Sequence, residues 1–368
     1  MSVVLDARTA TDHFPGIGRY VVSLSAALAR FSSDMTVILL HNPADSSGRL
    51  TLPDLPRVPC PASPFSMRQQ WVVPRLLHRA GATIYHSPYY LMPYRPGIPT
   101  VLTCYDIIPL LFPHYFPAHQ RLVFRVAHSL ALRAASVILA ISQATRDDLV
   151  QRLGVSASRV HVTPLAADER FRPQPSSEIG RVRGVYRLPE HYVLYVGSNK
   201  PHKNLVRLVQ AWAAVEAETS DTYLVIAGHR DHRYPQAERV AADLTVRVLF
   251  IGPVADADLP ALYSGARCFV FPSLYEGFGL PVLEAMACGT PVACSNVSSL
   301  PEVAGDAALY FDPRAVESVT ATLCRIVTDA ELRHQITRLG LQQAASFSWQ
   351  HTANLTLAAY RATSSLAS

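Results

Sequence analysis

Short apolar runs alternate with amphipathic stretches along the first part of the chain. Aliphatic and β-branched residues dominate six runs that predict strands, at residues 3–5, 35–40, 83–85, 100–104, 136–141 and 160–163. Apolar residues spaced three and four positions apart predict helices between them, at 18–30, 67–80, 120–135 and 143–153. This alternation is typical of parallel βαβ units and predicts a doubly wound α/β sheet.

The alternation stops at residues 170–177, which are rich in Pro and Ser and predict a linker. It then restarts. Strands are expected at 192–196, 222–227, 246–251, 268–271, 291–294 and 308–311, and helices at 204–218, 257–265, 280–287, 315–329 and 331–346. Ser348 has the character of an N-cap for a last helix reaching about residue 363. We therefore expect one α/β domain at 1–172, a second at 173–348, and a C-terminal helix at 349–368 that packs back on the first domain.

The composition suits a folded, two-domain protein. The chain has 368 residues, of which 49% are hydrophobic and 17% charged, so two cores are expected and disorder is not. The six cysteines form no C-x-x-C pair, which is typical of a reducing compartment. The first residues have no signal-peptide pattern, and no apolar run approaches 18 residues, so we expect a cytoplasmic protein. The net charge of +5 includes no basic run of the kind that binds nucleic acid.

A glycine-containing segment at 16–20 follows the first predicted strand and opens a helix. Gly16 and Gly18 let the backbone approach a ligand closely, and a helix N-terminus offers free N–H groups to a phosphate. An ordinary glycine turn explains the segment equally well. By itself, it is a weak indication of a phosphate site.

The loop at 197–204 contains Lys200 and Lys203, which are the only lysines in the chain. Two cations beside a helix N-terminus suit a diphosphate, and Ser198 lies in the same loop. The alternative is a solvated loop between a strand and a helix. The scarcity of lysine elsewhere favours a phosphate-binding role.

The segment 276–284 has two glutamates, Glu276 in a loop and Glu284 in the helix that follows. Carboxylates accept hydrogen bonds from sugar hydroxyls, and the N–H groups between them suit phosphate oxygens. A favourable helix-dipole interaction of about 0.3–1 kcal/mol would explain Glu284 but not Glu276. The intervening turn and helix start are Gly277, Phe278, Gly279 and Leu280.

With these motifs the sequence resembles glycosyltransferase family 4, the retaining group 1 transferases. Their GT-B fold consists of two facing Rossmann-like domains. The E-x7-E segment at 276–284 is similar to the family signature, and Lys203 to its phosphate-binding lysine. The segment from 251–254 through Tyr263 resembles the base-binding stretch. Segments 298–305 and 311–313 resemble the closing "P-E-x-x-G … D-P" pattern. The matches extend over essentially the whole chain.

The resemblance implies a role for each motif. Glu284 would hold the donor ribose, Glu276 the hydroxyls of the donor sugar, and Val254 would lie beside the base. Lys203 and backbone N–H groups near Leu280 and at 16–18 would bind the diphosphate. No metal or other cofactor is expected, because Lys and helix dipoles would neutralise the leaving group. The departing phosphate would take the acceptor proton in a same-face displacement.

Two positions depart from the family pattern. Family members often have His-Asp after the strand at 100–104, where this chain has Tyr105-Asp106. We expect Asp106 at the reaction centre and assign Tyr105 there as well, since a phenol also donates a hydrogen bond. His202 stands where an Arg often precedes the lysine, and Lys200 would share its charge.

Segments 106–113 and 197–204 resemble the mannosyltransferase-like branch, which implies GDP-mannose as the first donor candidate and UDP-sugars next. The implied acceptor is a glycan or lipid-linked saccharide in polysaccharide or O-antigen synthesis. Arginine and apolar residues at 67–79 and 120–133 suggest peripheral contact with an anionic membrane, although core-packing helices have the same pattern. Two alternatives remain open: a GT-B-shaped sugar-nucleotide epimerase and a non-catalytic sugar-nucleotide-binding protein.

Overall fold

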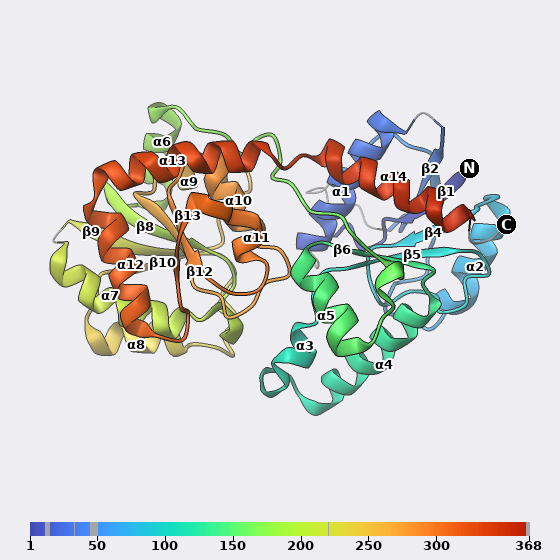
Figure 1. Cartoon of the computed structure of the whole chain (residues 1–368), viewed down its shortest axis with the longest axis horizontal. Helices are drawn as coiled ribbons and strands as arrows, with labels where there is room; N and C mark the ends of the chain where they lie inside the picture. Colours follow the sequence, from blue (N-terminus) through green and yellow to red (C-terminus); the bar gives the residue numbers. More distant parts are fainter. Residues whose placement is uncertain (12–14, 33, 45–50, 220, 366–368) are drawn as a thin grey trace. The chain divides into compact units, whose positions relative to one another are not determined.

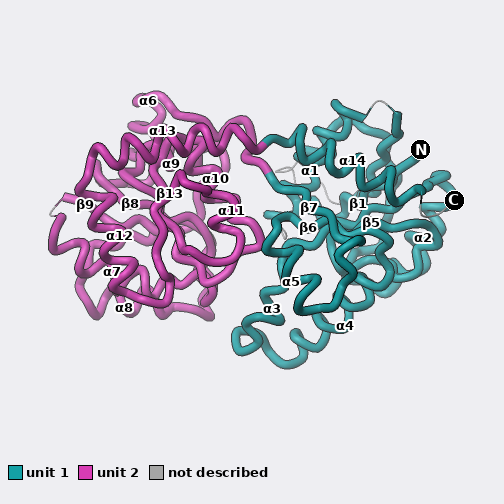
Figure 2. The backbone as a smooth tube through the Cα atoms, in the orientation of Figure 1, with its two compact units in different colours: residues 1–165, 348–368 teal, residues 166–347 magenta. Residues whose placement is uncertain are grey.

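The computed structural model describes residues 1–11, 15–32, 34–44, 51–219 and 221–365. The chain forms two compact units, residues 1–165 with 348–368 and residues 166–347 (Figure 2). The sequence placed the first boundary later, at residue 172. The structure assigns residues 166–172 to the second unit, where the Phe171 ring lies edge-on to Tyr263 with centroids 6.0 Å apart.

The first unit is built on a parallel seven-stranded sheet with the order β3-β2-β1-β4-β5-β6-β7. Every residue of β4 and β5 is buried, as expected for parallel strands covered on both faces. The strand order reverses between β1 and β4, so the loops after β1, β4 and β5 emerge at one edge near this switch point. The strands are β1 (Ser2–Asp6), β2 (Thr36–His41), β3 (Arg57–Pro59), β4 (Ile84–Ser87), β5 (Thr100–Cys104), β6 (Val137–Ala140) and β7 (Val160–Val162).

Helices cover both faces of this sheet (Figure 1). The two longest on one face, α1 (Pro15–Phe31) and α14 (Trp349–Ser365), pack against each other, so the C-terminal helix returns to the first unit as expected. The Ser348 hydroxyl accepts the His351 N–H (3.1 Å), which confirms the N-cap. Helices on the other face share a core with β5 and β6, and they are α2 (Gln69–Arg79), α4 (Ala118–Ala134) and α5 (Gln143–Leu153). The short helix α3 (Ile108–Leu111) precedes α4.

Four buried polar side chains form a hydrogen-bonded chain through the first unit. The hydroxyls of Tyr20 and Thr103 lie 2.9 Å apart, and His86 contacts Thr103 through Nε2 (2.8 Å) and Tyr360 through Nδ1 (2.7 Å). Burial lowers the pKa of His86 to about 3, so its imidazole is neutral. The chain therefore joins α1 and α14 to β4 and β5 without a buried charge.

We expect Thr103→Val to destabilise the first unit more than Thr103→Ser. Valine keeps the shape of threonine but leaves Tyr20 and His86 without their shared partner, at a cost of about 1–3 kcal/mol for each unpaired group. Serine keeps the hydroxyl and loses one methyl, which costs about 1 kcal/mol. Urea unfolding of both variants measures the difference, and equal losses would show that the hydrogen bonds contribute nothing.

The second unit has a parallel six-stranded sheet with the order β10-β9-β8-β11-β12-β13, which reverses between β8 and β11. Its strands are β8 (His191–Val196), β9 (Thr222–Ala227), β10 (Val248–Gly252), β11 (Cys268–Phe271), β12 (Val292–Ser295) and β13 (Ala308–Phe311). The helices α7 (Leu205–Glu218), α8 (Gln236–Leu244) and α12 (Val316–Thr328) pack together. A second packed group contains α6 (Ser176–Tyr186), α9 (Leu259–Ser264), α10 (Leu280–Ala287), α11 (Leu300–Ala304) and α13 (Ala330–Ala345).

Within the part of the chain that the structure describes, no helix combines the length and the apolar character needed to cross a membrane.

Candidate functional site

Two loops of the second unit meet where its strand order reverses. The loop after β8 contains a short 3-10 helix, η3 (Pro201–Lys203), and the loop after β11 leads into α10. The Leu274 N–H donates to the His202 carbonyl (2.8 Å), which joins the loops directly. Asn204 adds a second link, because its amide donates to the carbonyls of Pro272 (3.1 Å) and Pro313 (2.7 Å). Ligands of open α/β sheets bind at such a switch point.

Lys203 and Glu276 form an ion pair between these loops. The Lys203 Nζ donates to Glu276 Oε1 at 2.6 Å, and only 17% and 11% of the two side chains are exposed. The ammonium also lies 5.3 Å from the centroid of the Phe271 ring, within the range of a cation–π interaction. The structure thus brings together the lysine and the first glutamate of the predicted site, although they are far apart in the sequence.

The backbone around Glu276 is held by two serines. The Glu276 N–H donates to the Ser298 hydroxyl (2.9 Å), and Ser298 adopts a left-handed φ of 51° there. The Ser299 hydroxyl bonds the carbonyls of both Glu276 (2.9 Å) and Phe278 (2.8 Å). This turn is buried and preorganised, so the backbone from which the Glu276 side chain extends is fixed.

Gly279 is required by both conformation and space. Its φ is 99°, and a Cβ at this position would lie 2.5 Å from Leu300 Cδ2. It precedes α10, which begins at Leu280. Gly277 and Phe278 are buried beside it, and the Phe278 ring lies edge-on to Phe347. The glycine turn predicted from the sequence is therefore a close-packed entry to a helix.

Glu284 lies in the second turn of α10, as predicted, and it is 4% exposed. Its Oε2 accepts a hydrogen bond from the buried Tyr263 hydroxyl at 3.1 Å. The Tyr263 ring in turn packs edge-on against Phe171 and Phe269. Glu276 and Glu284 therefore have different partners, Lys203 for the first and Tyr263 for the second.

The remaining predicted donor residues of this unit lie in loops at the carboxyl ends of β8 and β10. Lys200 is exposed, and the Ser198 carbonyl accepts the Tyr195 hydroxyl (2.8 Å). Val254 is half-buried two residues after β10. Asn199, which the sequence analysis did not identify, connects this loop to the next, because its amide donates to the carbonyls of Asp231 (3.0 Å) and Tyr234 (2.9 Å).

His202 does not supply a positive charge to this site. The side chain is 5% exposed, and burial lowers its pKa to about 3, with Lys203 and Lys200 lowering it further. The family pattern often has an arginine at this position. The imidazole is instead a neutral, buried group, so Lys200 and Lys203 supply the positive charge of this loop.

In the first unit, the predicted residues follow β1 and β5, two strands that flank β4. Gly16 is exposed and Gly18 buried in the first turn of α1, and a Cβ at Gly16 would meet no heavy atom within 4 Å. The backbone at Gly16 is thus open to a ligand. Asp106 Oδ1 accepts the Ile108 N–H (2.9 Å), which fixes the turn after β5.

The Tyr105 side chain points into the first unit. Its ring lies edge-on to Tyr20 with centroids 5.5 Å apart, and Tyr20 in turn lies 6.2 Å from Trp349. The Tyr105 hydroxyl is buried and has no hydrogen-bond partner among the described residues. Burial also raises the pKa of this phenol well above its usual value, so the group is a neutral donor.

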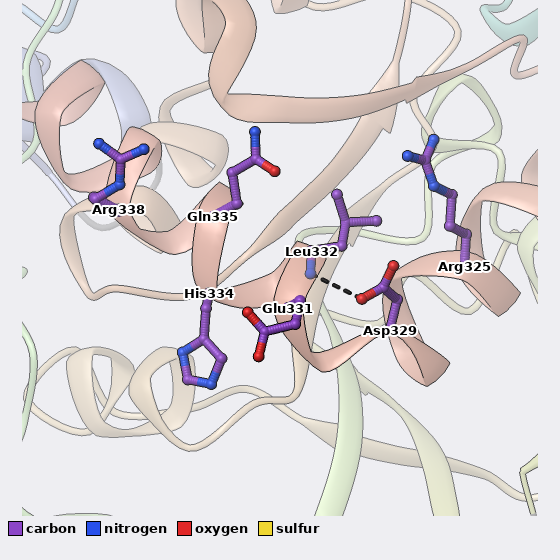
Figure 3. Close-up of a pocket in the computed structure, with 7 residues that line it drawn as sticks. All are labelled: Arg325, Asp329, Glu331, Leu332, His334, Gln335 and Arg338. Carbon is purple, nitrogen blue, oxygen red and sulfur yellow. Dashed lines mark hydrogen bonds between the residues drawn. The ribbon is translucent and has the colours of Figure 1, made fainter.

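Sequence reasoning missed the residues that hold the site together. Tyr263, Ser298 and Ser299 lay in segments that resembled the family, but no local pattern connects them to Glu276 or Glu284. Asn199 lies in the predicted phosphate loop and Phe271 at the end of a predicted strand, but no local pattern marked either as part of the site. A close-up of the α12–α13 junction (Figure 3) shows a surface hollow lined by residues such as Arg325, Glu331 and Arg338, and none of the predicted site residues lines it.

Solved structures with the same architecture define the fold. Sucrose-phosphate synthase from Thermosynechococcus elongatus superposes with a TM-score of 0.78 at 22% identity, covering 98% of both chains. HepE from Anabaena, in complex with UDP and glucose, superposes with a TM-score of 0.76 at 19% identity, covering 98% of this chain and 100% of that one. The two parallel-sheet units thus have the GT-B fold of these structures.

Sequence comparison defines the family. The model described as "Glycosyltransferase Family 4" matches residues 15–171, and that described as "Glycosyl transferases group 1" matches residues 181–343. The O-antigen chain mannosyltransferase B of Escherichia coli is 36% identical, over 94% of this chain and 96% of that protein. The chain belongs to the group 1, family 4 glycosyltransferases, and it is a glycosyltransferase.

Proposed function

We propose that the protein transfers mannose from GDP-mannose to a glycan or lipid-linked acceptor in O-antigen-type polysaccharide synthesis, with retention of anomeric configuration. The observation that carries this proposal is the Lys203–Glu276 pair at the switch point of the second unit. A sugar-nucleotide donor needs a cation for its diphosphate and a carboxylate for its sugar hydroxyls, and this pair supplies both. The mannosyltransferase of E. coli, similar along almost the whole chain, supports mannose as the sugar.

In this proposal the second unit binds the donor. Glu284, already oriented by Tyr263, accepts hydrogen bonds from the ribose hydroxyls. Lys203, assisted by Lys200 and the N–H groups at the start of α10 near Leu280, binds the diphosphate. Ser198 and Val254 line the nucleotide. In the first unit, the backbone N–H groups at Gly16 and Gly18 are proposed phosphate donors, and a Cβ at Gly16 would meet no heavy atom within 4 Å.

The proposed reaction places the attacking acceptor hydroxyl and the leaving diphosphate on the same face of the sugar. The departing phosphate oxygen takes the acceptor proton as the new glycosidic bond forms. The protein then contributes positioning and electrostatic stabilisation of the charge that develops on the diphosphate. Lys203 performs this stabilisation without a metal ion, Glu276 orients the sugar, and Asp106 lies at the acceptor side. Tyr105 belongs to this proposed set by its position beside Asp106, while its hydroxyl is buried in the first unit without a partner among the described residues.

Thermal shift with a panel of GDP, UDP, ADP and dTDP tests the donor. A nucleotide that binds only the native state at 100 times its Kd stabilises the protein by about 2.7 kcal/mol, and we expect the largest rise in Tm with GDP. Transfer from GDP-mannose with the anomeric configuration retained, unchanged by EDTA, is expected next. A shift with UDP alone would reject GDP-mannose, and inhibition by EDTA would reject metal independence.

The first unit also has a surface suited to peripheral membrane contact. On α4, Leu122, Val123 and Val126 are at least half exposed, and Arg125 and Arg133 are exposed beside them. The helix contains no acidic residue. On the same face of the sheet, residues 65–79 expose Phe65, Met67 and Trp71 together with Arg68, Arg75 and Arg79. Exposed apolar side chains mixed with arginine suit the interface of an anionic bilayer.

We expect the protein to co-sediment with vesicles that contain phosphatidylglycerol and much less with pure phosphatidylcholine vesicles. Leu122→Ser combined with Val126→Ser removes exposed apolar area without touching the core, so this variant should bind less while its Tm is retained. Arg125→Gln with Arg133→Gln should reduce binding to the anionic vesicles only. Equal sedimentation with both kinds of vesicle would contradict the proposal.

A further inference from the structure

A loop with two adjacent tyrosines occupies the carboxyl end of β4. This strand lies between β1 and β5, so its loop emerges between the segments that contain Gly16 and Asp106. Tyr89 and Tyr90 are half-buried, with ring centroids 4.3 Å apart and planes inclined at 45°. Neither tyrosine belongs to the motifs assigned above to the donor.

Hydrogen bonds and ring packing hold the two tyrosines in place. The Ser87 hydroxyl donates to the Tyr89 carbonyl at 2.6 Å, and the Tyr90 ring lies edge-on to Phe124 of α4 at 4.9 Å. After the pair, the Gln70 amide donates to the Met92 carbonyl (2.9 Å), and its oxygen accepts the Tyr94 N–H (2.9 Å). The Tyr90 ring thus packs on the core of the first unit, and the Tyr89 ring packs on Tyr90. A ligand would meet aromatic surface that costs little conformational entropy to order.

The chemistry around the pair matches a sugar ring. The Tyr89 hydroxyl donates to the Tyr90 hydroxyl at 3.1 Å. Burial raises the pKa of both phenols, with a smaller contribution from the Asp106 carboxylate, so both stay protonated. Asp106 follows β5, the strand that pairs with β4, so its segment and the loop of the two tyrosines emerge at neighbouring strand ends. Aromatic faces pack against the C–H face of a pyranose, while a carboxylate and phenols exchange hydrogen bonds with its hydroxyls. Apolar surface with a few convergent polar groups is typical of a small-molecule site.

We infer that Tyr89, Tyr90 and Asp106 form a pyranose-binding subsite that holds the terminal sugar of the acceptor. The inference rests on the proposed transfer reaction, because an acceptor hydroxyl must approach the donor from outside the nucleotide site. It extends the proposed function by assigning acceptor recognition to the loop after β4. A core role explains Tyr90, whose ring packs on Phe124, but it leaves the half-buried Tyr89 unexplained.

Tyr89→Leu and Tyr89→Phe separate the aromatic face from the hydroxyl. With methyl α-D-mannopyranoside as acceptor, we expect Tyr89→Leu to raise the acceptor KM about tenfold, the effect of losing roughly 1.4 kcal/mol of binding. Tyr89→Phe should stay within about threefold, since it keeps the ring. The Kd of the nucleoside diphosphate selected by thermal shift should change in neither variant. Tyr223→Leu is the matched control, because Tyr223 is a half-buried tyrosine at the amino end of β9 in the other unit.

An unchanged acceptor KM in Tyr89→Leu, or a parallel loss of nucleotide affinity, would overturn the subsite. Saturation-transfer NMR keeps this test independent of turnover. The wild-type protein should transfer magnetisation to methyl α-D-mannopyranoside, or to the matching glucoside or galactoside, and Tyr89→Leu should lose that signal. If no donor reacts but the pyranoside signal depends on Tyr89, the subsite stands and the proposed donor fails. If transfer occurs but no pyranoside signal depends on Tyr89, the subsite is wrong and the proposed function stands.

Discussion

Replacing Glu276 with alanine should lower glycosyl transfer at least 100-fold in a protein that remains folded. The Glu276 side chain is 11% exposed and extends from a turn fixed by Ser298 and Ser299, and its carboxylate lies 2.6 Å from the Lys203 ammonium. Its loss removes an acceptor for the donor-sugar hydroxyls. It also leaves Lys203, the cation proposed for the diphosphate, without its ion-pair partner. Loss of one preorganised electrostatic contact costs about 10²–10³ in rate in well-studied sites. Steady-state transfer, with circular dichroism as the check on folding, measures the effect.

Two further variants sharpen this expectation. Glu276→Gln keeps the size of the side chain and a hydrogen-bond acceptor for Lys203 but not the charge, so it should retain more activity than alanine. Glu317→Ala removes an exposed glutamate in the first turn of α12 of the same unit, and it should leave transfer unchanged. Turnover near the wild-type level in Glu276→Ala would remove this residue from the donor site.

Lys203→Ala should weaken binding of the nucleoside diphosphate by about 10- to 100-fold. A hydrogen bond to a charged group contributes about 1.5–3 kcal/mol, and each 1.4 kcal/mol is a factor of ten in Kd. The Lys203 side chain is only 17% exposed, so solvent screens its interaction with a phosphate incompletely. Isothermal titration calorimetry with the nucleotide chosen by thermal shift measures the change.

The only other lysine provides the control. Lys200 is exposed in the same loop, so solvent and salt screen its charge, and Lys200→Ala should weaken binding much less than Lys203→Ala. Raising the salt concentration should narrow the difference between wild type and Lys200→Ala. Calorimetric affinity that is unchanged in Lys203→Ala would contradict the assignment of this lysine to the diphosphate.

Most of the fold was predictable because its elements are encoded locally. The α5 helix at 143–153 begins and ends where its apolar spacing predicts, and α14 begins after Ser348 as its N-cap predicts. Several elements were not predicted, and two of them have weak local patterns. Strand β3 has three residues, ends at Pro59, and exists because it pairs with β2. Helix α6 begins at Ser176 inside the predicted linker, and Arg181 holds it to Asp258 at 2.6 Å.

The candidate site was predictable in its residues but not in its contacts. Glycine, lysine and glutamate at particular spacings indicated the phosphate and sugar chemistry of the second unit. No spacing indicated that Tyr263 would orient Glu284, or that Ser299 would bind the carbonyl of Glu276. Tyr105 agrees least with the prediction. Its sequence position suggested a hydrogen-bond donor to substrate, but its ring packs on Tyr20 and its hydroxyl is buried.

The sequence by itself determined the alternation of strands and helices, the glycine turn before α10, and the family. These depend on periodicity and on short motifs, which neighbouring residues encode. The tertiary structure alone decided that Lys203 meets Glu276, because the order of strands places β8 beside β11. It also decided that Arg8, one of many arginines in the first part of the chain, is a buried partner of Asp6 rather than part of a charged surface. Such contacts depend on which strands pair and which side chains their packing encloses, and residues distant in the chain settle both together.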